Sequence, residues 1–431
     1  MNTLNQMNYN NKSINKILGF LIAASPILDV YTLPSMPIGM GSISLMVFIP
    51  FVIKYTNFAL SLRKFQRFLL FCVYCIFISL LIAIIEGFKL ADPLIRVGVM
   101  LYYVAIVFVF SSVKDNQMTI LRSYMSLAIF SSIIIVFQFV IHYILGTDIF
   151  FILKGVPLNQ STISTYSQYV EMYSSMYSYS FRPTSLFLEP AHYALYVSPA
   201  IVLFLRNYKY HKQDLWKAIL VSLGILVSTA MTGYLFLAVA WCSLFFDSLK
   251  RQKWNTLILI LIVGCIGFIL FSRTEYYSTF WARISQLSSH SKGSSIEVRL
   301  LHGFDVFSTL GIEHKLLGIG LGNFSSYSLA SHYFDSIEYM SSISYILVSG
   351  GVVGFILFAL SILKIFHYFS VREAKIIFIQ LIVAYCVGST LFSLWDTFII
   401  IVCMVLNDNI TNEENLYKKG RFYALKLKTK T

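Results

Sequence analysis

A short segment, residues 181–193, gathers side chains that could do chemistry. It reads Phe-Arg-Pro-Thr-Ser-Leu-Phe-Leu-Glu-Pro-Ala-His-Tyr and leads into a long apolar run. Ionisable groups at membrane depth cost roughly 2.5–3.5 kcal/mol each, so they tend to be paired or functional. Arg182 offers a planar cationic fork for phosphate oxygens. Glu189, followed by His192, is the first candidate for a proton acceptor, and a structural salt bridge between Arg182 and Glu189 is the alternative.

A second segment supplies another cation and a glycine-rich run. Arg299 ends the stretch Ser-Ser-Ile-Glu-Val-Arg, and residues 316–324 read Leu-Leu-Gly-Ile-Gly-Leu-Gly-Asn-Phe. Such a run either exposes backbone N–H groups to an anion or forms an ordinary tight turn. It lacks the Gly-Lys-Ser/Thr ending of a P-loop, which argues against a nucleotide site. On the first interpretation Gly320, Gly322 and Asn323 bind substrate, and His332 is a further substrate-binding or proton-accepting candidate.

Four tyrosines between these segments share a helical spacing. They are Tyr166, Tyr169, Tyr173 and Tyr177, separated by three, four and four residues. This spacing places the rings on one face of a helix. Two interpretations stay open: an interfacial helix with tyrosines at headgroup level, or a platform on which Tyr173 binds sugar rings.

Neither the histidines nor the cysteines form a metal motif. His290, His302, His314 and His332 are 12, 12 and 18 residues apart, which is not the spacing of zinc ligands. All six cysteines lie in apolar runs, and the Cys72-x-x-Cys75 pair is interpreted as two small apolar helix residues. We therefore expect no metal, no cofactor and no disulfide framework.

The elements that must position these residues are apolar. Of the 431 residues, 57% are hydrophobic and only 12% are charged, with a mean hydropathy of +0.72. A spanning helix needs roughly 20 apolar residues, so we expect an all-α polytopic membrane protein of about 12 transmembrane helices. The predicted spans are approximately 17–34, 39–53, 68–86, 94–113, 119–145, 186–205, 215–230, 232–248, 254–271, 341–363, 375–391 and 393–406. The joints near 229–232 and 391–393 are short enough that each pair could be one long span.

The charges predict the orientation of these helices. With the N-terminus inside and the spans alternating, 24 of the 33 Lys and Arg residues lie on the inner side, as the positive-inside rule requires. The net charge of +13 then reflects orientation and not nucleic-acid binding. Both termini are predicted to be cytoplasmic, with the basic tail held to anionic lipid.

Two segments are too long to be simple connectors, and both fall on the outer side. The predicted organisation is helices 1–5 (1–145), a first large outer loop (146–185), helices 6–9 (186–271), a second large outer loop (272–340), helices 10–12 (341–406) and the tail (407–431). The inner side has no segment large enough for an ATPase or kinase domain.

Three of these motifs together resemble the O-antigen polymerase and ligase superfamily of bacterial polysaccharide assembly. They are Arg-Pro-Thr-Ser-Leu-Phe-Leu-Glu-Pro at 182–190, Ser-Ser-x-x-x-Arg ending at Arg299, and Leu-Gly-Ile-Gly-Leu-Gly-Asn-Phe at 317–324. The layout of many spans with two large outer loops is also similar. The sequence departs from the ligase branch, because Met340, Ser341 and Ser349 stand where that branch has a His-Asn pair and an acidic residue.

The resemblance implies a glycosyltransferase type C-like fold in the bacterial inner membrane. It implies a metal-independent, inverting polymerase that takes undecaprenyl-pyrophosphate-linked glycans as donor and acceptor, for O-antigen, capsule or exopolysaccharide. Arg182 and Arg299 would hold the pyrophosphate, and a flippase and a chain-length regulator would be partners. An O-antigen ligase is the close alternative. A flippase or transporter of lipid-linked glycans is the alternative of another class, although it would need more charge along its spans or paired broken helices.

Overall fold

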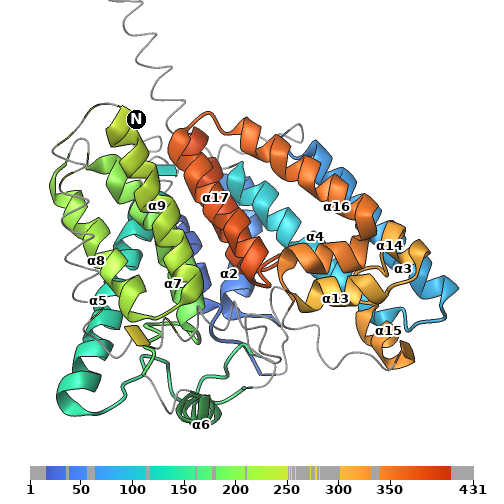
Figure 1. Ribbon diagram of the computed structural model, residues 1–431, viewed down its shortest axis with the longest axis horizontal. Coiled ribbons are helices and arrows are strands. Elements are labelled where there is room, and N and C mark those ends of the chain that lie inside the picture. The colour runs from blue at the N-terminus through green and yellow to red at the C-terminus, as the bar shows by residue number, and fades with distance from the viewer. Residues whose placement is uncertain are drawn as a thin grey trace, which may run out of the picture.

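The computed structural model describes nine stretches of the chain. They are residues 16–34, 38–55, 64–112, 117–160, 163–176, 181–208, 211–250, 301–331 and 340–408, with a few isolated positions between 252 and 281. Within them the protein is almost entirely helical (Figure 1). The strand-type pairing of the described residues is limited to two isolated bridges, Tyr31 with Leu158 and Thr32 with Gly39.

The helices follow one another with short connections in most places. The first part of the chain forms a helix at 16–28, α2 (Met40–Tyr55), α3 (Gln66–Ile85), α4 (Ala91–Ser111) and α5 (Gln117–Leu145). The middle forms α6 (Tyr166–Met176), α7 (Pro190–Asn207), α8 (Gln213–Val227) and α9 (Met231–Lys250). The last part forms α13 (His302–Thr309), α14 (Ile312–Leu317), α15 (Phe324–Ser331), α16 (Ser342–Tyr368), α17 (Arg372–Val387) and a helix at 394–408.

Several of these helices are suited to a lipid environment. Within the described residues, α3, α4, α5, α9 and α16 are long and apolar enough to cross a membrane, and the helix at 16–28 and α2 are shorter apolar helices. Large apolar side chains such as Phe77, Ile84 and Ile144 are 61–73% exposed on α3 and α5. So much exposed apolar surface is typical of a protein solvated by acyl chains. The chain is therefore an almost all-helical membrane protein.

Helices occupy every predicted apolar run that the structure describes. The predicted span at 254–271 lies outside the described residues except for isolated positions. The two short joints are true breaks: Thr229, between α8 and α9, has φ +52°, and Phe392, between α17 and the helix at 394–408, has φ +54°. A left-handed residue interrupts an α-helix, so each joint separates two helices. Gly351, with φ +63°, likewise divides α16 at a kink.

The centre of the bundle is α7. Fourteen of its eighteen residues are buried, and α5, α8, α9 and α17 all contact it. Hydroxyl groups tie it to its neighbours: Tyr193 donates to Ser132 Oγ (2.9 Å), and Tyr196 donates to the Ala23 carbonyl (2.8 Å). A side chain on the first turn of α7 is consequently held on a rigid support.

At one end of the bundle, polar side chains join the start of α3, the end of α16 and the end of the helix at 394–408. Lys64 Nζ lies 3.1 Å from Asp408 Oδ2, and the Tyr368 hydroxyl donates to Asp408 Oδ1 at 3.0 Å. Burial alone would lower the pKa of Lys64, but the Tyr368 hydroxyl and the Asp408 carboxylate outweigh it and raise that pKa above its ordinary value. The residues of chemical interest lie at the opposite end, which the charge pattern predicts to be the outer one.

Candidate functional site

The segment that precedes α7 is fixed to α5. Ser185 adopts a left-handed conformation, with φ +59°. Its backbone N–H donates to Gln138 Oε1 (2.8 Å), and its hydroxyl donates to the Ser131 carbonyl (2.6 Å). These partners are buried on the inward face of α5. A strained backbone conformation that is held by such contacts is common in segments that form functional sites.

Two tyrosines of α6 hold the same segment from the other side. Tyr169 and Tyr173 are 0% and 2% exposed and pack their rings against Phe150. The Tyr173 hydroxyl accepts the backbone N–H of Arg182 at 2.9 Å and donates to the Arg182 carbonyl. The prediction that Tyr173 offers a surface for sugar rings is therefore wrong: the ring is buried, and its role is to hold Arg182. Tyr177 lies outside the described residues.

The guanidinium group of Arg182 is directed toward the joint between α8 and α9. Its Nε donates to Thr229 Oγ1 at 2.9 Å, and its Nη2 donates to the Thr229 carbonyl at 3.2 Å. The side chain is partly buried. Among the ion pairs of the described residues there is none between Arg182 and Glu189. The alternative of a structural salt bridge between these two residues is thus excluded.

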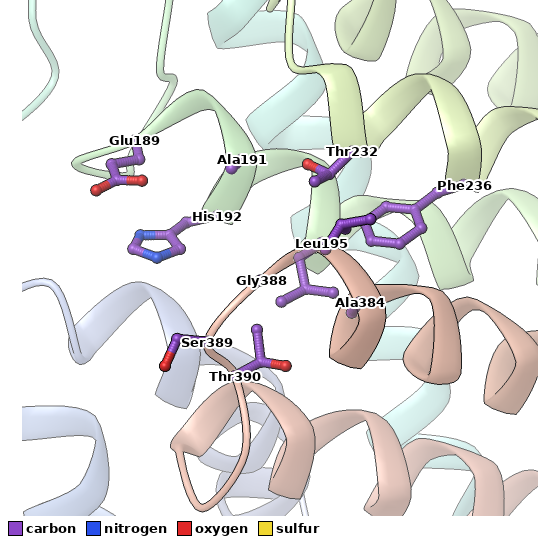
Figure 2. Close-up of a pocket in the computed structure, with 11 residues that line it drawn as sticks. Glu189, Ala191, His192, Leu195, Thr232, Phe236, Ala384, Gly388, Ser389 and Thr390 are labelled. Atoms are coloured by element: carbon purple, nitrogen blue, oxygen red, sulfur yellow. The ribbon is translucent and has the colours of Figure 1, made fainter. Parts of the chain in front are cut away.

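Glu189 and His192 lie at the first turn of α7. Glu189 has an extended backbone (φ −131°, ψ 144°), and Pro190 begins the helix, where its missing N–H is no loss. The Glu189 carbonyl accepts the N–H of His192 at 3.1 Å. Its carboxylate caps no backbone N–H of the helix. Figure 2 shows both side chains on one side of this turn.

The Glu189 and His192 side chains line a cavity of about 160 Å³ between the ends of α7, α9 and α17. Polar groups, namely the carboxylate, the imidazole and three hydroxyls, line it together with an apolar set (Figure 2). The lining residues are Glu189, Ala191, His192, Leu195, Thr232, Phe236, Ala384, Val387, Gly388, Ser389 and Thr390. Arg182 belongs to the same end, because its partner Thr229 precedes Thr232 by three residues. A few polar groups over an apolar lining are typical of small-ligand sites, but the cavity is smaller than the roughly 300–1,000 Å³ that such sites usually have.

Sequence reasoning missed the contribution of the loop that follows α17. Gly388, Ser389 and Thr390 line the cavity, and Trp395, just beyond, stacks on His192 with ring centroids 4.8 Å apart and an interplanar angle of 17°. The signal available in the sequence was the short polar stretch Gly-Ser-Thr at 388–390, which falls within the predicted span 375–391, at its outer end. Because the stretch carries no ionisable group, the span was predicted to continue through it.

The glycine run at 318–322 does not line the cavity and packs against α3 and α16. The N–H groups of Ile319, Gly320 and Leu321 donate to the Val348 carbonyl, the Ser349 carbonyl and Ser79 Oγ. Gly318, Gly320 and Gly322 all have φ between +82° and +86°. The predicted anion-binding loop is wrong for this part of the run, because these donors are already used within the protein.

Asn323 is buried in the same packing unit. It is 0% exposed, and its Nδ2 donates to the Ser79 and Ile319 carbonyls at 2.9 Å each. None of Gly320, Gly322 and Asn323 lines the cavity. Gly320 lies against α3 and α16, Gly322 lies against Asp92 and Pro93 of α4, and Asn323 lies against α3, which fits the tight-turn interpretation.

The remaining predicted residues divide into two groups. Arg299 and His332 lie outside the described residues, as does His290. His314 lies 3.7 Å from Glu86 and packs edge-on against Tyr327. Cys72 and Cys75 are buried free thiols within α3. No three His, Cys, Asp or Glu side chains in the described stretches lie close enough to share a metal ion.

Comparison of the whole sequence with protein-family models and with curated proteins finds no match. The resemblance to the polysaccharide superfamily therefore rests on the local motifs and the layout of apolar runs. Functional inference must come from the site itself.

Proposed function

We propose that the chain is a polymerase of lipid-linked oligosaccharide repeat units. The observation that carries this proposal is the meeting of Glu189 and His192 in the lining of one cavity, at the same end of the bundle as Arg182. A carboxylate, an imidazole and hydroxyls can bind a sugar and accept its proton. A fixed guanidinium suits a diphosphate.

The reaction would be a single displacement. A hydroxyl of the acceptor glycan attacks the anomeric carbon of the donor, the bond from that carbon to the pyrophosphate oxygen breaks, and the configuration inverts. Glu189 takes the hydroxyl proton, with His192 beside it to bind the acceptor. Negative charge grows on the departing undecaprenyl pyrophosphate, and Arg182 offers a cation whose position is set beforehand by Tyr173 and Thr229.

The topology forms part of the proposal. Twelve spans with both termini cytoplasmic would place the cavity at the outer face of the bacterial inner membrane, where flipped lipid-linked glycans are found. The asymmetric distribution of Lys and Arg supports this orientation. Arg299, from the second outer loop, would join Arg182 at the pyrophosphate, and the resemblance adds a flippase and a chain-length regulator as partners. A reporter fused after Ser291 should read out the periplasm or exterior, and a cytoplasmic signal would contradict the topology.

The decisive experiment replaces Arg182 in the native host. Loss of one charge-stabilising donor costs on the order of 10²–10³ in rate, so Arg182→Ala should abolish long surface glycan chains on a gel, while Arg182→Lys should retain a small part of them. Arg206→Ala, at the other end of α7, is the matched control and should leave the ladder intact. Normal long chains in Arg182→Ala at normal protein level would refute the catalytic role.

A deletion strain separates the close alternatives. Loss of a polymerase leaves single repeat units on the acceptor lipid, whereas loss of a ligase leaves long chains on the carrier lipid. Loss of a flippase leaves repeat units unextended and accessible only from the cytoplasmic side. We expect the first pattern.

A further inference from the structure

We infer that Asp396 is a positioning residue, which folds the turn at 388–397 and thereby holds Trp395 flat against His192. This deepens the proposed function, because the effect on catalysis rests on His192 acting there. The placement of the Trp395 ring against the His192 ring by Asp396 does not depend on the proposed function.

Asp396 uses both carboxylate oxygens to organise the turn. Oδ1 accepts the N–H groups of Ser393 (3.0 Å) and Thr397 (2.7 Å). Oδ2 accepts the N–H of Phe392 (3.0 Å) and the hydroxyl of Tyr385 (3.3 Å). The residue is only 5% exposed. A buried carboxylate is tolerated only when it is hydrogen-bonded, and here its partners are chiefly the backbone of its own turn.

The turn needs such support because its backbone is strained. Phe392 is a bulky residue with φ +54°, a conformation that persists only when its surroundings impose it. The other half of the turn is held by Ser342 at the start of α16. Its hydroxyl donates to the Gly388 carbonyl (2.9 Å) and accepts the N–H groups of Thr390 (2.9 Å) and Leu391 (3.0 Å). Ser342 thus fixes the part that lines the cavity, and Asp396 fixes the part that carries Trp395.

Trp395 transmits this order to the cavity. Its ring stacks on His192 at 4.8 Å and lies 5.7 Å from Phe187. His192 is therefore placed between the first turn of α7 and an indole plane that Asp396 orients. In Figure 2 the imidazole faces the loop that bears Ser389 and Thr390. A shift of Trp395 would leave the imidazole without the plane that sets its rotamer.

The charged and titratable neighbours of His192 and Asp396 come from several helices. Glu189 lies beside His192 on its own turn. Tyr385 of α17 donates to Asp396. Tyr103 of α4 lies within electrostatic reach of Asp396 and also of Asp29, which follows the first helix. Among these residues, Glu189 is the ionisable group that lies beside the imidazole of His192.

Asp396→Asn is the sharpest probe of this arrangement. The amide keeps the size of the carboxylate but replaces one accepting oxygen with a donor. If the NH₂ group takes the place of Oδ2, it faces the N–H of Phe392, and the strained residue loses its acceptor. Tyr385→Phe is the matched control, because it removes one bond to the same oxygen and leaves the three backbone bonds in place.

The first measurement reads ring stacking and requires no catalysis. The emission of Trp395 is obtained as the difference between each purified full-length protein and its Trp395→Phe counterpart. Contact with an imidazole quenches the emission of an indole, so at one fixed pH the emission of Trp395 should rise in His192→Gln and in Asp396→Asn. It should keep its native intensity in Tyr385→Phe. Native Trp395 emission in Asp396→Asn would overturn the proposal.

The second measurement concerns the reaction and separates the two proposals. Since misplacement of a reacting group by about 1 Å can cost 10²-fold, Asp396→Asn and Trp395→Leu should each lower kcat roughly 10-fold to 100-fold with little change in KM. Trp395→Leu leaves the turn untouched, so it tests the stacking even if Asp396→Asn folds poorly. If both variants keep the native kcat while Glu189→Gln is inactive, the positioning role is wrong and the proposed function stands. If the native protein does not polymerise glycan while the Trp395 emission differs between the variants as expected, the proposed function alone is rejected.

Discussion

The segments that precede α7 and α16 look alike in sequence and differ in what they do. Each is a polar stretch with an arginine and a conspicuous motif, and each was predicted to bind substrate. The first presents Glu189 and His192 to a cavity. The described part of the second turns its motif inward, where Gly320 and Asn323 contact α3 and α16. The ionisable side chains of the first motif line a cavity, whereas the glycines of the second pack against neighbouring helices.

The difference has a physical origin. A carboxylate or imidazole at the end of a spanning helix is costly to bury, so it is directed to a polar opening. A glycine has no side chain to present, and its advantages are a left-handed backbone and close approach. Both advantages are used at 318–322 to bring a loop against two helices. The following predictions test whether the two segments divide in this way, beginning with the largest effect.

Glu189→Gln should have the greatest effect on the reaction. A positioned general base contributes roughly 10²–10⁴ in rate, and the amide keeps the shape of the carboxylate while losing its basicity. Chain growth from a lipid-linked repeat unit, measured with protein in vesicles, should fall by about that factor. Glu171→Gln, an exposed position on α6, is the control and should leave the rate unchanged. A native rate in Glu189→Gln together with a large loss in His192→Gln would assign the proton to the imidazole.

From the sequence, the residues of interest before α7 could be selected, but the residues that contact them could not. The position of Pro190 predicted the start of a helix, and α7 begins there; that the turn is functional stays a prediction. The bond from Arg182 to Thr229 and the stack of Trp395 on His192 join residues 47 and more than 200 positions apart. Hydropathy and local spacing carry no information about which helices become neighbours. The contribution of the loop after α17 to the cavity could therefore not be predicted.

Gly320→Ala should act on stability and not on the reaction. Gly320 has φ +83°, and a Cβ there would lie 2.6 Å from Ser79 Cα and 2.7 Å from Asn323 Nδ2. Left-handed strain of about 1–2 kcal/mol and overpacking of about 1–3 kcal/mol predict a loss of roughly 2–5 kcal/mol. The midpoint of thermal unfolding in detergent should fall clearly. Gly98→Ala, in an open position on α4, should unfold at the native midpoint or slightly above it, because alanine favours the helix.

The outcome for Gly320→Ala bears directly on the comparison. If the variant is stable but inactive, the glycine run takes part in substrate binding after all, and the two segments are not different in kind. Lower stability with a native rate per folded molecule would establish the packing role. Sequence alone could not decide this, because a run of glycines with positive φ is equally compatible with an anion nest and with close helix contact.

Tyr173→Phe should give the smallest effect, and one confined to the first segment. The ring stays in its buried place against Phe150, but the backbone N–H of Arg182 loses its acceptor. The loss of such a bond is worth about 1 kcal/mol, so stability should fall slightly. Because Arg182 is held on one side by this hydroxyl, chain growth should slow by roughly threefold to tenfold, in line with a modest shift of its cation. Tyr166→Phe, two turns earlier in α6, is the control. Equal rates in the two variants would mean that the bond to Thr229 alone is enough to position the guanidinium.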